Sequence, residues 1–122
     1  MDNFFDQEAE AVARVLIGKT FVCGGKRGTI SKVQPFSREE NAHRYKPVLA
    51  MRPGEVYCGW ANGYVMLLLV TAGGGCILLQ CAQLDGVLRD GPGKLSRALG
   101  LTKSGAAGAT RWLDATTFEI NI

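Results

Sequence analysis

The sequence predicts one α+β domain in which a few helices pack on a curved antiparallel sheet. The chain has 122 residues, enough for one hydrophobic core but not for two. Apolar residues make up 47% and charged residues 20%, which is typical of a globular domain. The 16 glycines indicate many tight turns between short strands. Helical periodicity at the start, then several strands, a second helix and a last strand complete the α+β pattern.

The first expected element is a helix that runs from Asp6 to about Ile17. Asp6 is a good N-cap, Phe5 can pack onto Ala9, and Gly18 ends the helix. Its apolar residues share one helical face: Ala9, Val12, Ala13 and Leu16.

Two strands, at 20–23 and 29–33, are expected next. The glycine-rich segment 24–28 joins them as a hairpin with a basic tip formed by Lys26 and Arg27. Residues 35–53 look irregular and polar, and loops of this length in small domains are usually functional or disordered.

The strongest hairpin signal is Asn62-Gly63, which predicts a two-residue turn between strands 55–60 and 64–71. The second of these strands is apolar on both faces and is therefore expected at the centre of the sheet. The glycines at 73–75 lead into an adjacent antiparallel strand at 76–82. We expect these side chains to be buried: Leu67, Leu69, Ile77 and Leu79.

A short helix is expected after Asp90, which can cap it. Pro92 suits the first helical position, and Gly100 suits the left-handed residue that ends a helix. A loop of small residues at 104–110, then Trp112, and a closing strand near 117–120 follow.

Residues 90–101, Asp-Gly-Pro-Gly-Lys-Leu-Ser-Arg-Ala-Leu-Gly-Leu, also closely resemble a signature of the alkyladenine (3-methyladenine) DNA glycosylases. That family has Ser-Gly-Pro-Gly-Lys-Leu-x-x-Ala-Leu-Gly here. The text from Phe4 to Lys19 resembles the family's entry into its first helix. The resemblance spans about residues 4–113 and implies a shortened, divergent family member. It implies the glycosylase fold, which also resembles the C-terminal domain of methionyl-tRNA formyltransferases.

The same resemblance indicates a degenerate active site. Gln34 stands where the family has the glutamate that activates water, and Phe36 where a tyrosine stacks on the extruded base. His43 stands at the position of the histidine that closes the base pocket. Gly59 replaces the second pocket tyrosine, and Gln80 replaces an arginine.

These replacements predict that base excision is lost. A glutamine amide cannot take up a proton, and removal of a general base typically lowers a rate by about two to four orders of magnitude. Stacking on an aromatic ring contributes about 1–3 kcal/mol per base, and Gly59 has no ring. Asn62 replaces the tyrosine that the family wedges into DNA. Glu39 or Glu40 could act as a substitute base, although a solvated charged loop is the plainer interpretation.

The sequence keeps more of the residues that could bind phosphate than of the residues that base excision needs. The net charge of +3 permits acidic partners without requiring them. Candidate phosphate contacts are Lys26, Arg27, Arg38, Arg44, Lys46, Arg52, Lys94 and Arg97. The start of the second helix offers a seat for a phosphate. Trp60 and Tyr64 flank the hairpin tip and are expected to face the same way, either as a stacking platform or packed onto the core.

Three functions remain open from the sequence. The first is a DNA-binding protein without glycosylase activity, and the second is a divergent DNA glycosylase of base excision repair. The third is a scaffold that docks on protein or structured RNA in a larger assembly. The four cysteines lack CxxC spacing, so we expect free thiols, no metal and no cofactor. The apolar run 64–72 is too short to span a bilayer, and no secretory or transit signal is evident. We therefore expect no membrane partner and a cytoplasmic, nuclear or nucleoid location.

Overall fold

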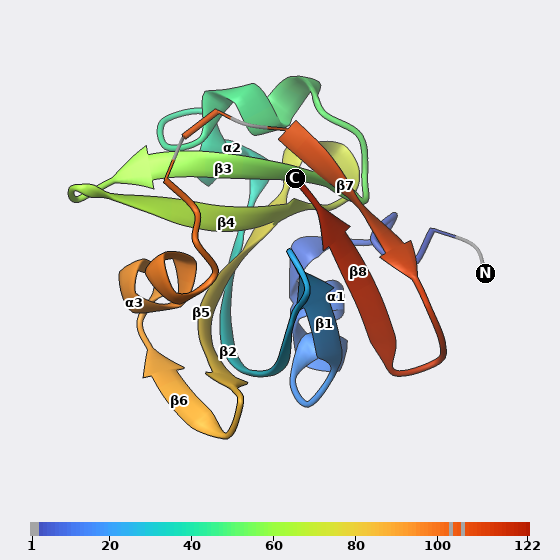
Figure 1. Cartoon of the computed structure of the whole chain (residues 1–122). Coiled ribbons are helices and arrows are strands. Elements are labelled where there is room, and N and C mark those ends of the chain that lie inside the picture. Colours follow the sequence, from blue (N-terminus) through green and yellow to red (C-terminus); the bar gives the residue numbers. More distant parts are fainter. Residues whose placement is uncertain (1–2, 103, 106) are drawn as a thin grey trace.

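The strands form a sheet that closes into a seven-stranded barrel (Figure 1). A computed structural model describes residues 3–102, 104–105 and 107–122. The barrel order is β2-β1-β8-β7-β3-β4-β5, and β2 pairs with β5 to close it, while β6 pairs with one end of β5. The strands are β1 (Thr20–Cys23), β2 (Lys26–Phe36), β3 (Glu55–Ala61), β4 (Tyr64–Val70), β5 (Cys76–Leu84), β6 (Val87–Asp90), β7 (Ala107–Trp112) and β8 (Thr117–Asn121).

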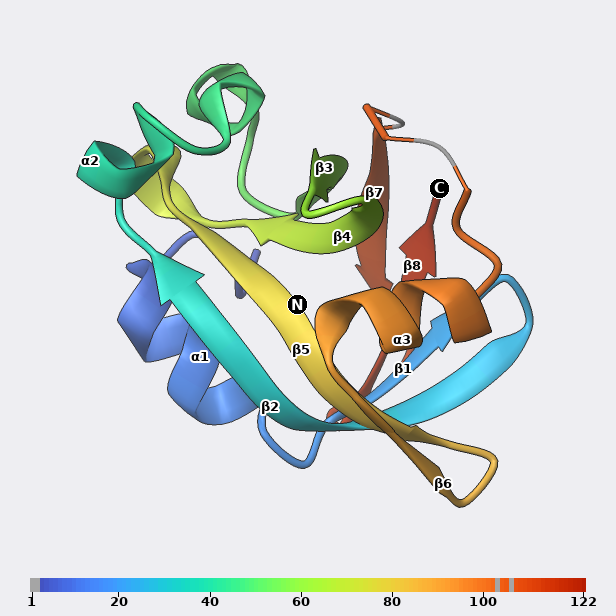
Figure 2. The same cartoon turned by 90° about the vertical axis from the view of Figure 1, so that its left-hand side faces the viewer.

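Helices cover this barrel on more than one side. They are α1 (Ala9–Leu16), α2 (Arg38–Asn41) and α3 (Pro92–Ala98), with 3-10 turns η1 (Lys46–Ala50) and η2 (Ala72–Gly74). Figure 2 shows α1 and α3 on opposite sides of the β2–β5 pair. The α+β class and the single domain expected from the sequence are confirmed.

The sheet is mixed, so the expectation of an antiparallel sheet is wrong for one pair of strands. Strand β1 runs parallel to β8, with Thr20 opposite Thr117 and Cys23 opposite Ile120. Hairpin signals predict only pairs of neighbouring strands, which are antiparallel. The β1–β8 pairing joins strands from distant parts of the chain, and no local signal announces it.

The central position of β4 is confirmed. Strand β4 pairs with β3 on one side and with β5 on the other. Its residues alternate between two separate buried clusters, and both faces are therefore covered. The four side chains expected to be buried are at most 1% exposed: Leu67, Leu69, Ile77 and Leu79.

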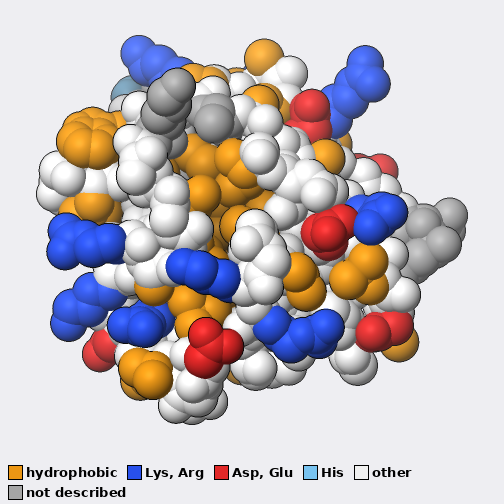
Figure 3. Space-filling model, viewed as in Figure 1, with side chains coloured by type: hydrophobic (Ala, Val, Ile, Leu, Met, Phe, Trp, Pro, Cys, Tyr) orange, Lys and Arg blue, Asp and Glu red, His pale blue; other side chains and the backbone are white. Residues whose placement is uncertain are grey.

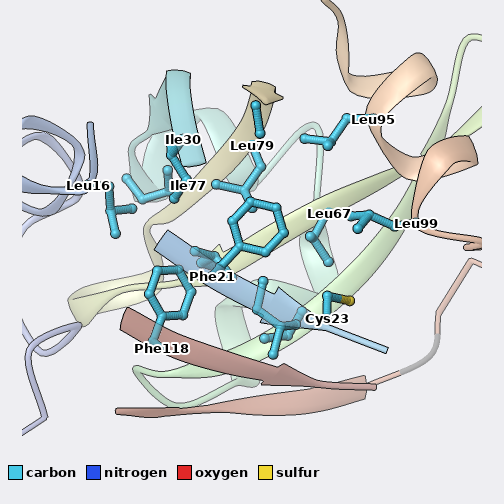
Figure 4. Close-up of a cluster of buried hydrophobic side chains, with 14 of the residues drawn as sticks. Leu16, Phe21, Cys23, Ile30, Leu67, Ile77, Leu79, Leu95, Leu99 and Phe118 are labelled. Atoms are coloured by element: carbon cyan, nitrogen blue, oxygen red, sulfur yellow. The ribbon is translucent and has the colours of Figure 1, made fainter. Parts of the chain in front are cut away.

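The inner cluster fills the barrel (Figure 4). Leu16 of α1 and both Leu95 and Leu99 of α3 point toward strand side chains such as Phe21 and Phe118. All of these side chains are at most 7% exposed. Burial of this apolar surface is the main force that holds the helices on the barrel.

An outer cluster lies beneath the segment expected to be an irregular loop. Residues 35–53 instead complete β2 and form α2 and η1. Tyr45 and Val48 from this segment pack on Phe36, Met66 and Leu68 of the barrel wall. We call residues 42–50 the lid, because they cover this outer face. The expectation of an irregular segment is wrong because two apolar side chains anchor it.

Both predicted helix caps are also corrected. Helix α1 begins at Ala9 rather than at Asp6, because the Asp6 N–H donates to the Asn3 carbonyl in a turn (3.0 Å) that places Phe5 in the core. Asp90 belongs to β6, and its Oδ1 accepts the thiol of Cys81 (3.2 Å).

Other strand boundaries also differ from the sequence expectation. Strand β6 was not expected, and β7 occupies much of the 104–110 segment, of which residue 106 lies outside the described residues. The predicted end of α3 is confirmed, since Gly100 has φ 78° and the Leu101 N–H bonds to the Ser96 carbonyl (2.9 Å).

Candidate nucleic-acid interface

Helix α3 is held against the barrel by its apolar face and by one close glycine contact. Leu95 and Leu99 reach the inner cluster. Gly93 lies against the ring of Tyr64, where a Cβ would come within 2.8 Å of the Tyr64 Cγ. Any larger residue would push the helix away from β4. The exposed side of α3 then carries Lys94 and Arg97.

Four cations from three chain segments gather around α3. Lys94 and Arg97 of α3 and Arg89 of β6 line a shallow hollow of about 320 Å³. Lys26, at the start of β2, donates its Nζ to the Ala98 carbonyl at the C-terminal end of α3 (2.5 Å). We call Lys26, Arg89, Lys94 and Arg97 the basic face. Figure 3 shows Lys and Arg side chains gathered on the α3 and β6 side of the molecule.

The charge of the basic face is not neutralised by ion pairs. Within the described residues, the ion pairs join Glu10 to Arg14 and Glu119 to Arg111. The neighbouring acid, Asp90, is occupied with the Cys81 thiol. Clustered cations without acidic partners create a positive potential that attracts polyanions. The sequence predicts a phosphate-binding position at the start of α3. Because α3 is only 7 residues long, its N-terminus alone does not make such a site.

A second hollow of about 260 Å³ lies beside the basic face. Trp60, Tyr64 and Arg97 are among its lining residues. The indole of Trp60 is 59% exposed, whereas Tyr64 is half-buried and packs against the outer cluster. Arg97 borders both hollows, so the two form one continuous surface.

The expected common orientation of Trp60 and Tyr64 is wrong. The two-residue turn, with Asn62 at φ 53° and Gly63 at φ 84°, confirms the predicted hairpin. It places Trp60 opposite Val65 and Ala61 opposite Tyr64. Paired residues share a face and neighbours alternate, so the two side chains leave the hairpin from opposite faces, although both border the hollow beside α3.

The positions that the resemblance assigns to a catalytic centre do not line one common pocket among the described residues. Phe36 lines a hollow of about 510 Å³ with Pro35, Arg38 and Glu40, and the other four positions are not among its lining residues. Gln80 Nε2 donates to Gln34 Oε1 (2.9 Å), so the two replaced positions bind each other. Phe36 is only 2% exposed and meets Tyr45 edge-on, with 5.5 Å between ring centroids. A Cβ on Gly59 would lie 3.3 Å from the Tyr45 ring. The space that two flat walls would enclose is therefore filled by Tyr45.

The acidic and basic residues of α2 and the lid have separate surroundings. His43 is exposed, and the Arg44 guanidinium lies 5.5 Å from the centre of the Phe36 ring. Glu40 completes a capping box with Ser37, because its Oε1 accepts the Ser37 N–H (3.1 Å). Glu39 is exposed on α2.

The remaining predicted contacts do not join the basic face. Arg52 lines a different hollow with Asn3 and Trp112. Arg27 is exposed beside Lys26 and pairs with Val22 in the β1–β2 hairpin, and Asn62 is exposed at its turn. The structure thus unites Lys26, Trp60, Tyr64, Lys94 and Arg97 around α3.

Arg89 is the member of the basic face that was not predicted as a phosphate contact from the sequence. It lies on β6, and the turn before β6 is Asp85-Gly86, with φ 51° and 76°. Asp-Gly is a strong hairpin signal, so the dipeptide could have revealed the strand. The convergence of Arg89 on α3, however, is a tertiary effect that the dipeptide does not predict.

The cysteines are buried thiols. Burial raises the pKa of Cys58 to about 11 and that of Cys76 to about 12. A protonated thiol is a poor nucleophile and metal ligand. Within the described residues, no three His, Cys, Asp or Glu side chains converge as a metal site. None of the helices there has the length and apolar character to cross a bilayer.

Comparison with known proteins adds no family to these observations. The sequence matches none of the protein-family models and has no significant match among curated proteins.

Proposed function

We propose that this protein binds DNA through the basic face and does not excise bases. The carrying observation is the convergence of Lys26, Arg89, Lys94 and Arg97 around α3, without ion pairs among the described residues. Lysine and arginine contacts to phosphates are independent of base sequence and supply most non-specific affinity for DNA. The resemblance to DNA glycosylases favours DNA over other polyanions.

The filled pocket supports the absence of excision. Base excision requires a group that activates water and an open pocket that receives the extruded base. Gln34 is held by Gln80, and the ring of Tyr45 occupies the space beside Gly59 and Phe36. The basic face therefore binds DNA in this proposal, and the chain does not catalyse base excision.

The experiment compares two charge reversals of equal size. One variant carries Lys94→Glu and Arg97→Glu on the basic face, and the control carries Arg44→Glu and Arg52→Glu elsewhere. Affinity for a fluorescently labelled duplex is measured by anisotropy at low salt. We expect the first variant to lose at least about tenfold in affinity and the control to change by less than about threefold, because only direct phosphate contacts release counterions.

Salt dependence supplies the second readout. Each neutralised phosphate contributes about −0.9 to the slope of log affinity against log salt concentration, so four contacts predict a slope of about −3.6. The Lys94 and Arg97 variant should have a slope shallower by about 1.8. Absence of duplex binding by the unmodified protein at low salt, or equal losses in both variants, would contradict the proposal.

A further inference from the structure

The hollow between the β3–β4 hairpin and α3 has the size and lining of a site for a single flat ring. Its volume is about 260 Å³, and its lining includes Trp60, Tyr64, Gly93, Ser96, Arg97 and Thr102. Drug-sized ligands occupy pockets of about 300–1,000 Å³, so this hollow suits a smaller ring system. None of the positions that correspond to the glycosylase centre lines it: Gln34, Phe36, His43, Gly59 and Gln80.

Trp60 is exposed in a way that packing does not explain. It is 59% exposed, although an indole offers a large apolar area for burial. Among the described residues it is the most exposed of the large hydrophobic side chains. It stands two residues before the two-residue turn, and its backbone pairs with that of Val65. An exposed indole that shares a hollow with an arginine is an arrangement on which nucleic-acid bases stack.

Arg97 links this ring site to the phosphate contacts. It lines the hollow with Trp60 and also the hollow with Lys94 and Arg89. A nucleotide whose base lies on Trp60 would therefore present its own phosphate to the basic face. Ser96, whose Oγ donates to the Gly93 carbonyl (3.2 Å), offers its oxygen as an acceptor at the inner wall.

We propose that this hollow receives one unpaired base of a DNA strand, stacked on Trp60. The inference rests on the proposed DNA binding and specifies the form of DNA. In a duplex each base is already stacked and paired, and its removal from the stack costs a few kcal/mol. A single strand offers its bases without that cost. The protein therefore binds single-stranded DNA more tightly than duplex of the same length.

The test compares a labelled oligodeoxythymidine of about 12 nucleotides, within the usual range of site sizes, with the corresponding duplex. The variants are Trp60→Ala and Trp60→Phe, with Leu113→Ala as a control at another exposed apolar residue, 46% exposed on the β7–β8 connection. We expect Trp60→Ala to weaken single-strand binding by about 5- to 150-fold, the range that corresponds to the known contribution of base stacking. Duplex affinity should change by less than about twofold, and Trp60→Phe should keep most of the single-strand affinity because it keeps a ring.

The salt slope separates this inference from the proposed function. Trp60→Ala should leave the slope unchanged, because stacking releases no counterions. Unchanged single-strand affinity in Trp60→Ala, with normal binding by the unmodified protein, would overturn the base site and leave the basic face intact. Equal losses on single strand and duplex would also overturn it. Binding of neither probe by the unmodified protein would overturn the proposed function together with this inference.

Discussion

The lid and the α3 surface each combine an arginine with an aromatic ring, but the ring is buried in one region and exposed in the other. In the lid, Arg44 lies over Phe36 and Tyr45 meets that ring edge-on, and Phe36 is only 2% exposed. Beside α3, Arg97 borders the same hollow as Trp60, whose ring is mostly exposed. The chemical groups are alike, and only the covering segment differs. Residue type alone therefore does not distinguish a packed cluster from an open, basic surface.

The covering segment differs because of two apolar side chains. Tyr45 and Val48 anchor the lid in the outer cluster, where both are at most 7% exposed. The hydroxyl of Tyr45 donates to the Met66 sulfur (2.9 Å), so the polar end of the ring is also satisfied. Across the hairpin, Trp60 has no comparable cover among the described residues.

The largest expected effect comes from opening the lid. Tyr45→Ala removes a buried ring and should lower the free energy of unfolding by about 3–5 kcal/mol, as aromatic-to-alanine changes in cores do. Trp60→Ala, at an exposed site, should change it by less than about 0.5 kcal/mol. Urea denaturation measures both. Tyr45→Phe, which keeps the ring, should cost about 1 kcal/mol and serves if the alanine variant does not fold. Similar losses at Tyr45 and Trp60 would remove the contrast between the two regions.

An intermediate effect is expected at alkaline pH. Cys76 belongs to the outer cluster, and burial raises the pKa of its thiol from 9.0 to about 12. The unfolded chain loses this proton near pH 9 while the native state keeps it, so the free energy of unfolding falls as pH rises from about 9 toward 12. This thiol should contribute about 1.4 kcal/mol per pH unit to that fall.

Chemical denaturation of Cys76→Ala between pH 8 and about 11 isolates the contribution of this thiol. The variant is expected to be less stable overall but to lose stability less steeply with pH. Parallel pH profiles for the two proteins would show that the Cys76 thiol titrates equally in both states.

The smallest expected effect is that of introducing the carboxylate that DNA glycosylases have at the position that Gln34 resembles. Gln34→Glu should leave stability within about 0.5 kcal/mol, because the side chain is exposed and can still accept from the Gln80 amide. It should not produce release of 3-methyladenine or hypoxanthine, because the Tyr45 ring fills the space between Phe36 and Gly59 where the extruded base would be held. Single-turnover assays of an alkylated or inosine-containing duplex with excess protein, beside a heat-inactivated control, measure this. Release above that control, by the variant or by the unmodified protein, would show that the pocket opens.

The elements that the sequence predicted well are those whose signals are local. The Asn62-Gly63 turn needs two consecutive residues with positive φ, and an apolar run such as 64–71 must be covered on both faces. The lid was not predictable in this way, since Tyr45 stands alone and the apolar run 48–51 is too short to show a helical or strand period. Their anchoring depends on a barrel surface formed by β4 and β5.

In the candidate site, too, single residues could be predicted from local signals, whereas their convergence could not. Lys94 and Lys26 were predicted as phosphate contacts one at a time, from their places at a helix start and a hairpin. The proximity of these two lysines to Arg89 of β6 follows only from the packing of α3 on β4 and β5. Arg44 and Arg52 looked equivalent in the sequence and lie elsewhere.

The parallel pairing of β1 with β8 has a consequence for the order of assembly. Thr20 and Thr117 are opposite one another although 117 − 20 = 97 residues separate them in the chain. Contacts of such separation slow folding, because the entropy of closing the loop is lost before the contact returns any energy. The β3–β4 hairpin is closed by a two-residue turn, so its contacts form without this large loss of entropy. During synthesis, β1 therefore leaves the ribosome with β2 as its only available partner and keeps an open edge until β8 arrives.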